Sequence, residues 1–151
     1  MSNHRIELQQ NAPKVVQAFI GIEKILASAE IEAGLHHLVQ LRGSQINGCA
    51  FCVDMHTRDA RKDGETSERL DRLVIWREVD DFSERERAAL AWTEALTQLN
   101  GSGALEDLHA GLTRHFSESE IAELTSRIAM INLWNRLQVA EHGGRGFPPA
   151  A

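Results

Sequence analysis

The chain has 151 residues, 42% of them apolar, and a formal net charge of −6, which suits one globular domain with a hydrophobic core. The acidic charge and the low aromatic content, 5% with no tyrosine, argue against a nucleic-acid-binding surface. No apolar run approaches the roughly 20 residues that span a bilayer, and residues 1–5 lack an apolar signal core. We therefore expect a cytoplasmic protein with a single domain over residues 1–151 and no nucleic-acid or membrane partner.

The apolar residues between Pro13 and Pro148 recur at intervals of three and four, and no proline interrupts them. This pattern predicts an all-α fold, a bundle of about six to seven helices with its core at about residues 15–140 and a short tail at each end. The expected helices span about 13–29, 32–46, 49–63, 67–77, 83–99, 104–115 and 117–140. Three of their inward faces are Val15, Phe19, Ile22 and Leu26; Leu35, Leu38 and Leu41; and Ala89, Trp92, Leu96 and Leu99.

Signals for helix ends support these bounds. Ser83 with Glu86 and Ser117 with Glu120 each form the pattern of a capping box. The pair Asn47-Gly48 predicts a turn immediately before the two cysteines of the chain. We therefore expect the C-x-x-C motif at the N-terminus of a helix.

The two cysteines, Cys49 and Cys52, are followed by His56. Residues three and four apart share one face of a helix, so these three side chains can point into one pocket. In a cytosolic protein a C-x-x-C pair is more often redox-active or metal-binding than a structural disulfide. At the first turn of a helix the unpaired N–H groups lower the pKa of a thiol, and a neighbouring imidazole can take its proton.

This chemistry favours a dithiol–disulfide cycle, because one helical turn brings the two Cα atoms to about 5–6 Å, within disulfide range. Zinc is the next alternative, with His36 or His37 as a fourth ligand, although a second C-x-x-C is missing. Two buried cysteines without a role are the third alternative. Haem attachment is excluded because it needs C-x-x-C-H, and valine follows Cys52.

The segment LVQLRGSQINGCAFCVDMH, residues 38–56, closely resembles the carboxymuconolactone decarboxylase superfamily in its AhpD-like alkylhydroperoxidase branch. The resemblance continues through TRDAR (57–61), GET (64–66), LVIW (73–76), ERERAALAW (84–92) and NLWNR (132–136), and so covers about residues 15–140. It implies an all-α fold that assembles as a homotrimer or as a hexamer built from trimers. It also implies the reduction of peroxides by the C-x-x-C pair, whereas the lactone-decarboxylating branch generally lacks this pair.

By this resemblance, Cys52 is the peroxidatic thiolate that becomes a sulfenic acid, Cys49 resolves it to a disulfide, and His56 is the base that deprotonates Cys52. A dithiol partner, a lipoylated protein in the best-known case, then reduces the disulfide. The family has a relay glutamate twelve residues before the first cysteine, where this chain has His37. Histidine can also shuttle protons, and the alternative is a partly exposed helix residue without a catalytic role.

We therefore expect a thiol-dependent peroxidase that reduces organic hydroperoxides or hydrogen peroxide, with Cys49, Cys52, His56 and His37 as catalytic residues and with no cofactor or metal. Two alternatives use the same cysteine pair: a zinc-binding module, and an oligomer whose dithiol senses oxidation without fast turnover. The other polar residues of the motif are expected to hold the turn, and the tryptophans to lie in the core or an interface. These residues are Arg42, Ser44, Gln45 and Asn47, and Trp76, Trp92 and Trp134.

Overall fold

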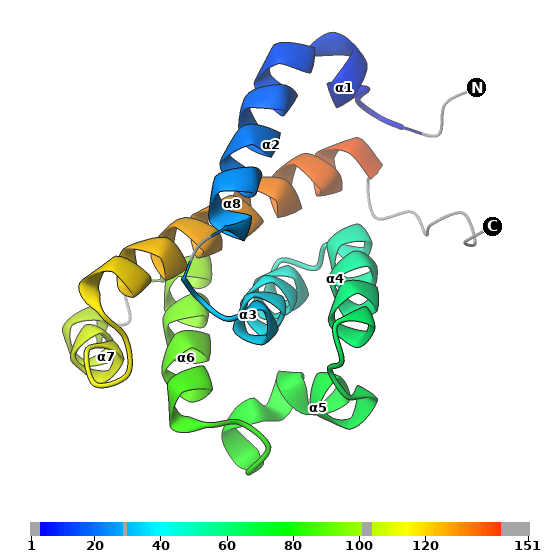
Figure 1. The fold of residues 1–151 in the computed structure, drawn as a ribbon. Coiled ribbons are helices and arrows are strands. Elements are labelled where there is room, and N and C mark those ends of the chain that lie inside the picture. Colours follow the sequence, from blue (N-terminus) through cyan, green and yellow to red (C-terminus); the bar gives the residue numbers. More distant parts are fainter. Residues whose placement is uncertain (1–3, 29, 101–103, 143–151) are drawn as a thin grey trace.

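The computed structural model describes residues 4–28, 30–100 and 104–142, and all its regular elements are helices (Figure 1). Residue 29, which ends the first predicted helix, and the parts of the predicted tails at 1–3 and 143–151 lie outside these ranges. The elements are α1 (Leu8–Asn11), α2 (Pro13–Ala27), α3 (Ala33–Ile46), α4 (Ala50–Lys62), α5 (Ser67–Arg72), the 3₁₀ helix η1 (Leu73–Glu78), α6 (Glu84–Gln98), α7 (Leu105–Leu112) and α8 (Glu118–His142). The predicted all-α fold is confirmed. None of the described helices has the length and apolar character needed to cross a membrane.

Helix α3 is the central element, in contact with α4, α6, η1 and α8. Its predicted inward residues are buried, and they divide between two apolar clusters. Leu35 belongs to the cluster that α3 forms with α6, α7 and α8, whereas Leu38 and Leu41 belong to the cluster with α4, α5, η1 and α6. At Gly43 the backbone of α3 runs close to α8, since a Cβ there would lie 3.2 Å from Cγ2 of Ile131. This close packing fixes the position of α8 relative to the end of α3.

The predicted helix ends are largely confirmed. In both capping boxes the serine Oγ accepts a hydrogen bond from the glutamate N–H, and the glutamate carboxylate accepts one from the serine N–H. Gly48 has a φ of 64°, in the left-handed region that glycine tolerates, and it links α3 to α4. The C-x-x-C motif therefore begins at a sharp turn whose conformation depends on this glycine.

The predicted helix at 67–77 is two elements. The backbone leaves helical geometry at Ile75 (φ −117°, ψ 27°), and residues from Leu73 onward form η1. Leu70, Leu73 and Trp76 are all buried in the same cluster, and a 3₁₀ helix repeats every three residues. The tighter winding of η1 thus keeps Leu73 and Trp76 on the buried face that Leu70 begins, while Ile75 is exposed.

Helix α2 also departs from its predicted packing. Its buried residues are Val16 and Leu26, while Val15 and Ile22, predicted to face inward, are exposed. Figure 1 shows α2 rising from its crossing with α8, away from the other helices. Helix α2 contacts the short helix α1 and packs on α8, and an apolar face of α2 remains exposed on the isolated chain.

Candidate functional site

The two cysteines lie at the start of α4, in the reduced form and each only 1% exposed. Cys49 is the N-cap of α4, one position before the first turn in which we expected it, and its Sγ accepts a hydrogen bond from the Cys52 N–H (3.4 Å). The backbone N–H of Cys49 donates to the Ser44 carbonyl (3.1 Å). The sulfur of Cys49 therefore occupies the position where a helix best stabilises negative charge.

A buried polar network ties this turn to α8. Asn47 Nδ2 donates to Oδ1 of Asn132 (3.0 Å) and of Asn135 (2.8 Å), and Asn135 Nδ2 donates to Ser44 Oγ (3.0 Å). The fully buried Asn135 also hydrogen-bonds to Cys49. Ser44 and Asn47 thus hold the turn as predicted, and they do so through two asparagines of α8.

Arg42 acts at a different place. Its guanidinium donates to Gln45 Oε1 (3.2 Å) and to Glu94 Oε1 on α6 (2.8 Å). Glu94 also accepts a hydrogen bond from Trp76 Nε1 (2.8 Å) and pairs with Arg77. Burial alone would raise the pKa of Glu94, but these donors hold it below its ordinary value. This carboxylate joins α3, η1 and α6, so Arg42 positions α3 within the bundle.

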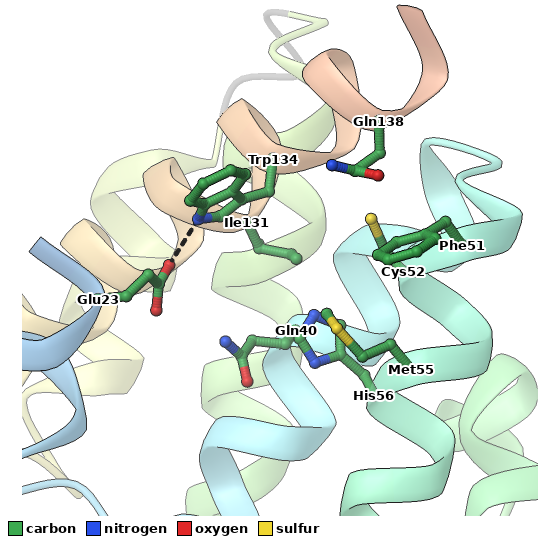
Figure 2. A pocket seen from close by; sticks show the side chains of 9 residues that line it. All are labelled: Glu23, Gln40, Phe51, Cys52, Met55, His56, Ile131, Trp134 and Gln138. Atoms are coloured by element: carbon green, nitrogen blue, oxygen red, sulfur yellow. Dashed lines mark hydrogen bonds between the residues drawn. The ribbon is translucent and has the colours of Figure 1, made fainter. Parts of the chain in front are cut away.

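A pocket of about 310 Å³ opens beside Cys52 (Figure 2). It lies between α4 and α8, with contributions from α2 and α3, and its surface is mostly apolar. Figure 2 shows the side chains of α4 facing those of α8 across the pocket. The lining residues are Glu23 on α2, Gln40 on α3, Phe51, Cys52, Met55 and His56 on α4, and Ile131, Trp134 and Gln138 on α8.

The structure brings together three of the four predicted site residues. Cys52 and His56 line the pocket, and Cys49 lies behind Cys52 at the start of the helix. His37 does not line the pocket: its Nε2 lies 2.7 Å from Oδ2 of Asp63, the C-cap of α4. Its buried Nδ1 has no hydrogen-bond partner among the residues that the structure describes. The residue of α3 that reaches the pocket is Gln40, one helical turn further on.

Glu23 is the carboxylate at the pocket, and sequence reasoning missed it. Its Oε1 accepts a hydrogen bond from Trp134 Nε1 (3.0 Å), and its Oε2 accepts one from Nη1 of the buried Arg127 (3.0 Å). No local pattern in α2 marks this residue, because its partners lie more than 100 positions further along the chain. By contrast, Ile131, Trp134 and Gln138 have the spacing of one helix face, a signal that could have identified the α8 wall.

The two thiols differ in acidity. Hydrogen bonds from the Cys52 thiol and backbone N–H outweigh burial and lower the pKa of Cys49 to about 7. The same contact with Cys49, together with burial, raises the pKa of Cys52 above that of an ordinary thiol. The first proton lost by the pair therefore leaves a thiolate at Cys49, with the remaining proton on Cys52.

His56 is neutral at physiological pH. Burial, with the residue only 7% exposed, lowers its pKa to about 4. The negative charge of Asp59 opposes this shift, and the positive charge of Arg127 adds to it. His36, on α3 outside the pocket, has its pKa lowered to about 4 for the same main reason. At neutral pH, His56 thus presents a free imidazole beside Cys52.

The chain combines an all-helical fold with a buried C-x-x-C-x-x-x-H site. Comparisons with known sequences identify the family that has these features. Residues 13–95 match the carboxymuconolactone decarboxylase family. The chain is also 36% identical to YdfG of Bacillus subtilis (strain 168) over 138 residues, 91% of this chain and 94% of that protein. The chain therefore belongs to the carboxymuconolactone decarboxylase family, in its AhpD-like branch.

Solved structures agree with this assignment. ATU0492 of Agrobacterium tumefaciens, a protein of unknown function suggested to be the antioxidant defence protein AhpD, superposes with a TM-score of 0.89 at 38% identity, over 98% of this chain and 99% of that one. The debrominase Bmp8 shares the fold with a TM-score of 0.78 at 24% identity, over 87% of this chain and 71% of its own. An AhpD-core protein of Ralstonia eutropha JMP134, described as peroxidase-related, has a TM-score of 0.78 at 20% identity, over 91% and 73% of the two chains.

Proposed function

We propose that this protein is a dithiol peroxidase that reduces organic hydroperoxides. The observation that carries the proposal is the arrangement of Cys52, which lines an apolar pocket of about 310 Å³ with Cys49 directly behind it and His56 beside it. An apolar pocket with a few polar groups suits a small organic molecule better than hydrogen peroxide, which has no apolar surface to bury. The relationship to a protein suggested to serve antioxidant defence supports the same reaction class.

The first step is attack by the Cys52 thiolate on the O–O bond of the peroxide. Because the pair first deprotonates at Cys49, the remaining proton passes from Cys52 to the Cys49 thiolate, or to the neutral imidazole of His56, before attack. A sulfur–oxygen bond then forms as the O–O bond breaks, and the departing alkoxide takes up a proton to become an alcohol. Cys52 is oxidised to a sulfenic acid while the peroxide is reduced by two electrons.

The second step closes a disulfide. The sulfur of Cys49 attacks that of Cys52, the sulfur–oxygen bond breaks, and the hydroxide leaves as water after protonation. The two sulfurs already hydrogen-bond in the reduced protein, so little movement is needed. A dithiol partner, a lipoylated protein by analogy with the family, then returns two electrons and two protons through thiol–disulfide exchange.

A single-turnover titration tests this function. The reduced full chain is mixed with tert-butyl hydroperoxide, and free thiols are counted in denaturant before and after the reaction. We expect two thiols to disappear for each peroxide consumed. Cys52→Ser should consume no peroxide, whereas Cys49→Ser should react once and then stop at the sulfenic acid. Thiols that survive excess peroxide in the wild-type chain would refute the proposal.

Two further measurements, turnover with a dithiol reductant and metal analysis, separate the two alternatives. A dithiol sensor would form the disulfide cleanly and reversibly, but no dithiol reductant would support rapid repeated turnover. A zinc module would contain one zinc ion per reduced chain, and Cys52→Ser would lose it. Metal analysis of the reduced wild-type chain beside reduced Cys52→Ser therefore distinguishes metal binding by the cysteines from redox chemistry.

A further inference from the structure

Beyond this function, we propose that His4, Glu141 and His142 form a binding site for a transition-metal ion of the zinc class. Two of these residues end α8, and the third precedes α1 at the other end of the chain. One ligand atom from each of the three lies within 4.8 Å of the others. His4 Nδ1 and Glu141 Oε1 are already 3.5 Å apart. The fold therefore brings two imidazoles and a carboxylate together from positions about as distant as the chain allows.

The N-terminal segment is held against the end of α8 by its own backbone. The Arg5 N–H donates to the Glu141 carbonyl (2.8 Å), and the Leu8 N–H donates to Glu141 Oε1 (3.2 Å). These two bonds anchor the segment that follows His4 to the end of α8 and so keep its imidazole close to that helix. The second carboxylate oxygen of Glu141, Oε2, takes no part in the contacts with Leu8 and His4.

The two imidazoles are oriented by aromatic contacts. The His4 ring meets the edge of the His142 ring at a centroid distance of 4.6 Å. The ring of Phe51 stacks on the His142 ring, with a centroid distance of 5.1 Å and an interplanar angle of 12°. These two ring contacts restrict the orientations that the His142 imidazole can adopt.

The donor set selects the class of ion. Imidazole nitrogen suits zinc and its neighbours in the first transition row, whereas calcium and magnesium prefer oxygen alone. Two histidines and one carboxylate are a known three-ligand set for zinc, which leaves a fourth position for water. Ligand atoms on a tetrahedral zinc ion lie about 3.4 Å apart for bonds of about 2.1 Å, so closing from 4.8 Å needs only side-chain rotation and small shifts.

The position at the end of α8 adds to the attraction. The last carbonyl groups of a helix carry partial negative charge, which favours a cation there. The site also adjoins the redox pocket without using its cysteines, because Phe51 and Gln138, one turn before His142, both line that pocket. A bound ion would thus fix the edge of the pocket while leaving both sulfurs free.

Equilibrium dialysis against Zn²⁺ tests the site. The protein is the full chain with Cys49→Ser and Cys52→Ser and without an affinity tag, so that neither thiols nor added histidines bind the ion. We expect one zinc per chain at pH 7.5. His4→Asn and His142→Asn should each weaken binding about tenfold or more, a loss at least as large as that seen when contacts outside the coordination sphere are removed. His115→Asn, at an exposed histidine beyond α7, is the matched control and should bind as the parent does.

Three results would overturn the proposal. The first is the absence of zinc binding in the parent. The second is binding that neither His4→Asn nor His142→Asn weakens, which would place the ion elsewhere. The third is binding that depends on His142 alone. Glu141→Gln provides a further check, because it retains an acceptor for the Leu8 N–H but removes the charge, and it too should weaken zinc binding.

Discussion

Cys49 and Cys52 differ in acidity, and only Cys49 caps a helix. Cys49 accepts N–H donors at the start of α4 and has the lower pKa, while Cys52 has the higher pKa and faces the pocket. The sulfur that lines the pocket is thus not the sulfur that first loses its proton. In the proposed mechanism, the Cys49 thiolate accepts the proton of Cys52, and Cys52 then attacks the peroxide as a thiolate.

This division predicts the pH dependence of the first oxidation step. The pKa of Cys49 is about 7, so the rate of Cys52 oxidation by tert-butyl hydroperoxide should rise up to about pH 7 and level off above it. In Cys49→Ser, Cys52 is still buried but has no thiolate beside it, so the inflection should move above about 8.5, the pKa of an ordinary thiol. Stopped-flow measurement of single turnovers gives both profiles. An inflection that remains near 7 in Cys49→Ser would assign the acidic thiol to Cys52 itself.

The buried histidines predict how stability depends on pH. The pKa values of His56 and His36 are about 4 in the folded chain and about 6.5 when unfolded, so between these values the unfolded chain binds more protons. The free energy of unfolding should therefore be fully maintained above pH 6.5 and should fall as the pH is lowered towards 4. For His56 alone, the loss from pH 7 to pH 5 is about 2 kcal/mol.

Urea unfolding at pH 7 and pH 5 measures this loss, and both values lie above the ordinary pKa of a carboxyl group. His56→Asn should reduce the difference between the two pH values. The exposed His115, changed to asparagine, should leave the difference as in the wild type. An equal free energy of unfolding at both pH values in the wild type would mean that His56 and His36 are not buried as neutral imidazoles.

At the scale of helices, the sequence predicted those features that depend on local chemistry. The capping boxes at Ser83 and Ser117 and the glycine turn at Gly48 were found because each is set by hydrogen bonds or backbone angles within a few residues. The break at Ile75 was missed because it arises from the packing of Leu73 and Trp76 against distant helices. The same reason applies to Glu23, whose role at the pocket depends on partners on α8.

The end of α6 shows a local conflict that sequence periodicity concealed. Leu99 continues the apolar spacing of α6 and was expected to face inward, but it is the C-cap, 72% exposed, with a φ of 47°. This left-handed conformation costs a residue with a Cβ about 1 kcal/mol of free energy, whereas glycine adopts it without that cost. Leu99→Gly should therefore raise the free energy of unfolding by about 1 kcal/mol in urea denaturation. Leu99→Ala keeps the Cβ and should give no such gain, so equal values for the two variants would contradict the explanation.

At the scale of the whole molecule, the exposed face of α2 bears on assembly. Val15, Ile22 and Ile25 are exposed on this helix, and Ile25 is 71% accessible in the isolated chain. Burying one such side chain contributes about 1.5–3 kcal/mol of favourable free energy. Exposed apolar residues that lie together therefore often mark an interface. We propose that α2 contributes to the contacts between subunits of a homotrimer or of a hexamer of trimers.

Light scattering during size exclusion tests the assembly, for which we expect three or six times the chain mass of 16.8 kDa. Ile25→Glu should shift the distribution towards smaller species, because an interface would have to bury the new charge. Val74→Glu, at an exposed apolar residue of η1, is the control and should retain the native mass. A monomeric wild-type chain would refute the assembly, and dissociation by Val74→Glu but not by Ile25→Glu would move the interface to η1. Since α2 also supplies Glu23 to the pocket, any variant that dissociates subunits through α2 should also slow Cys52 oxidation.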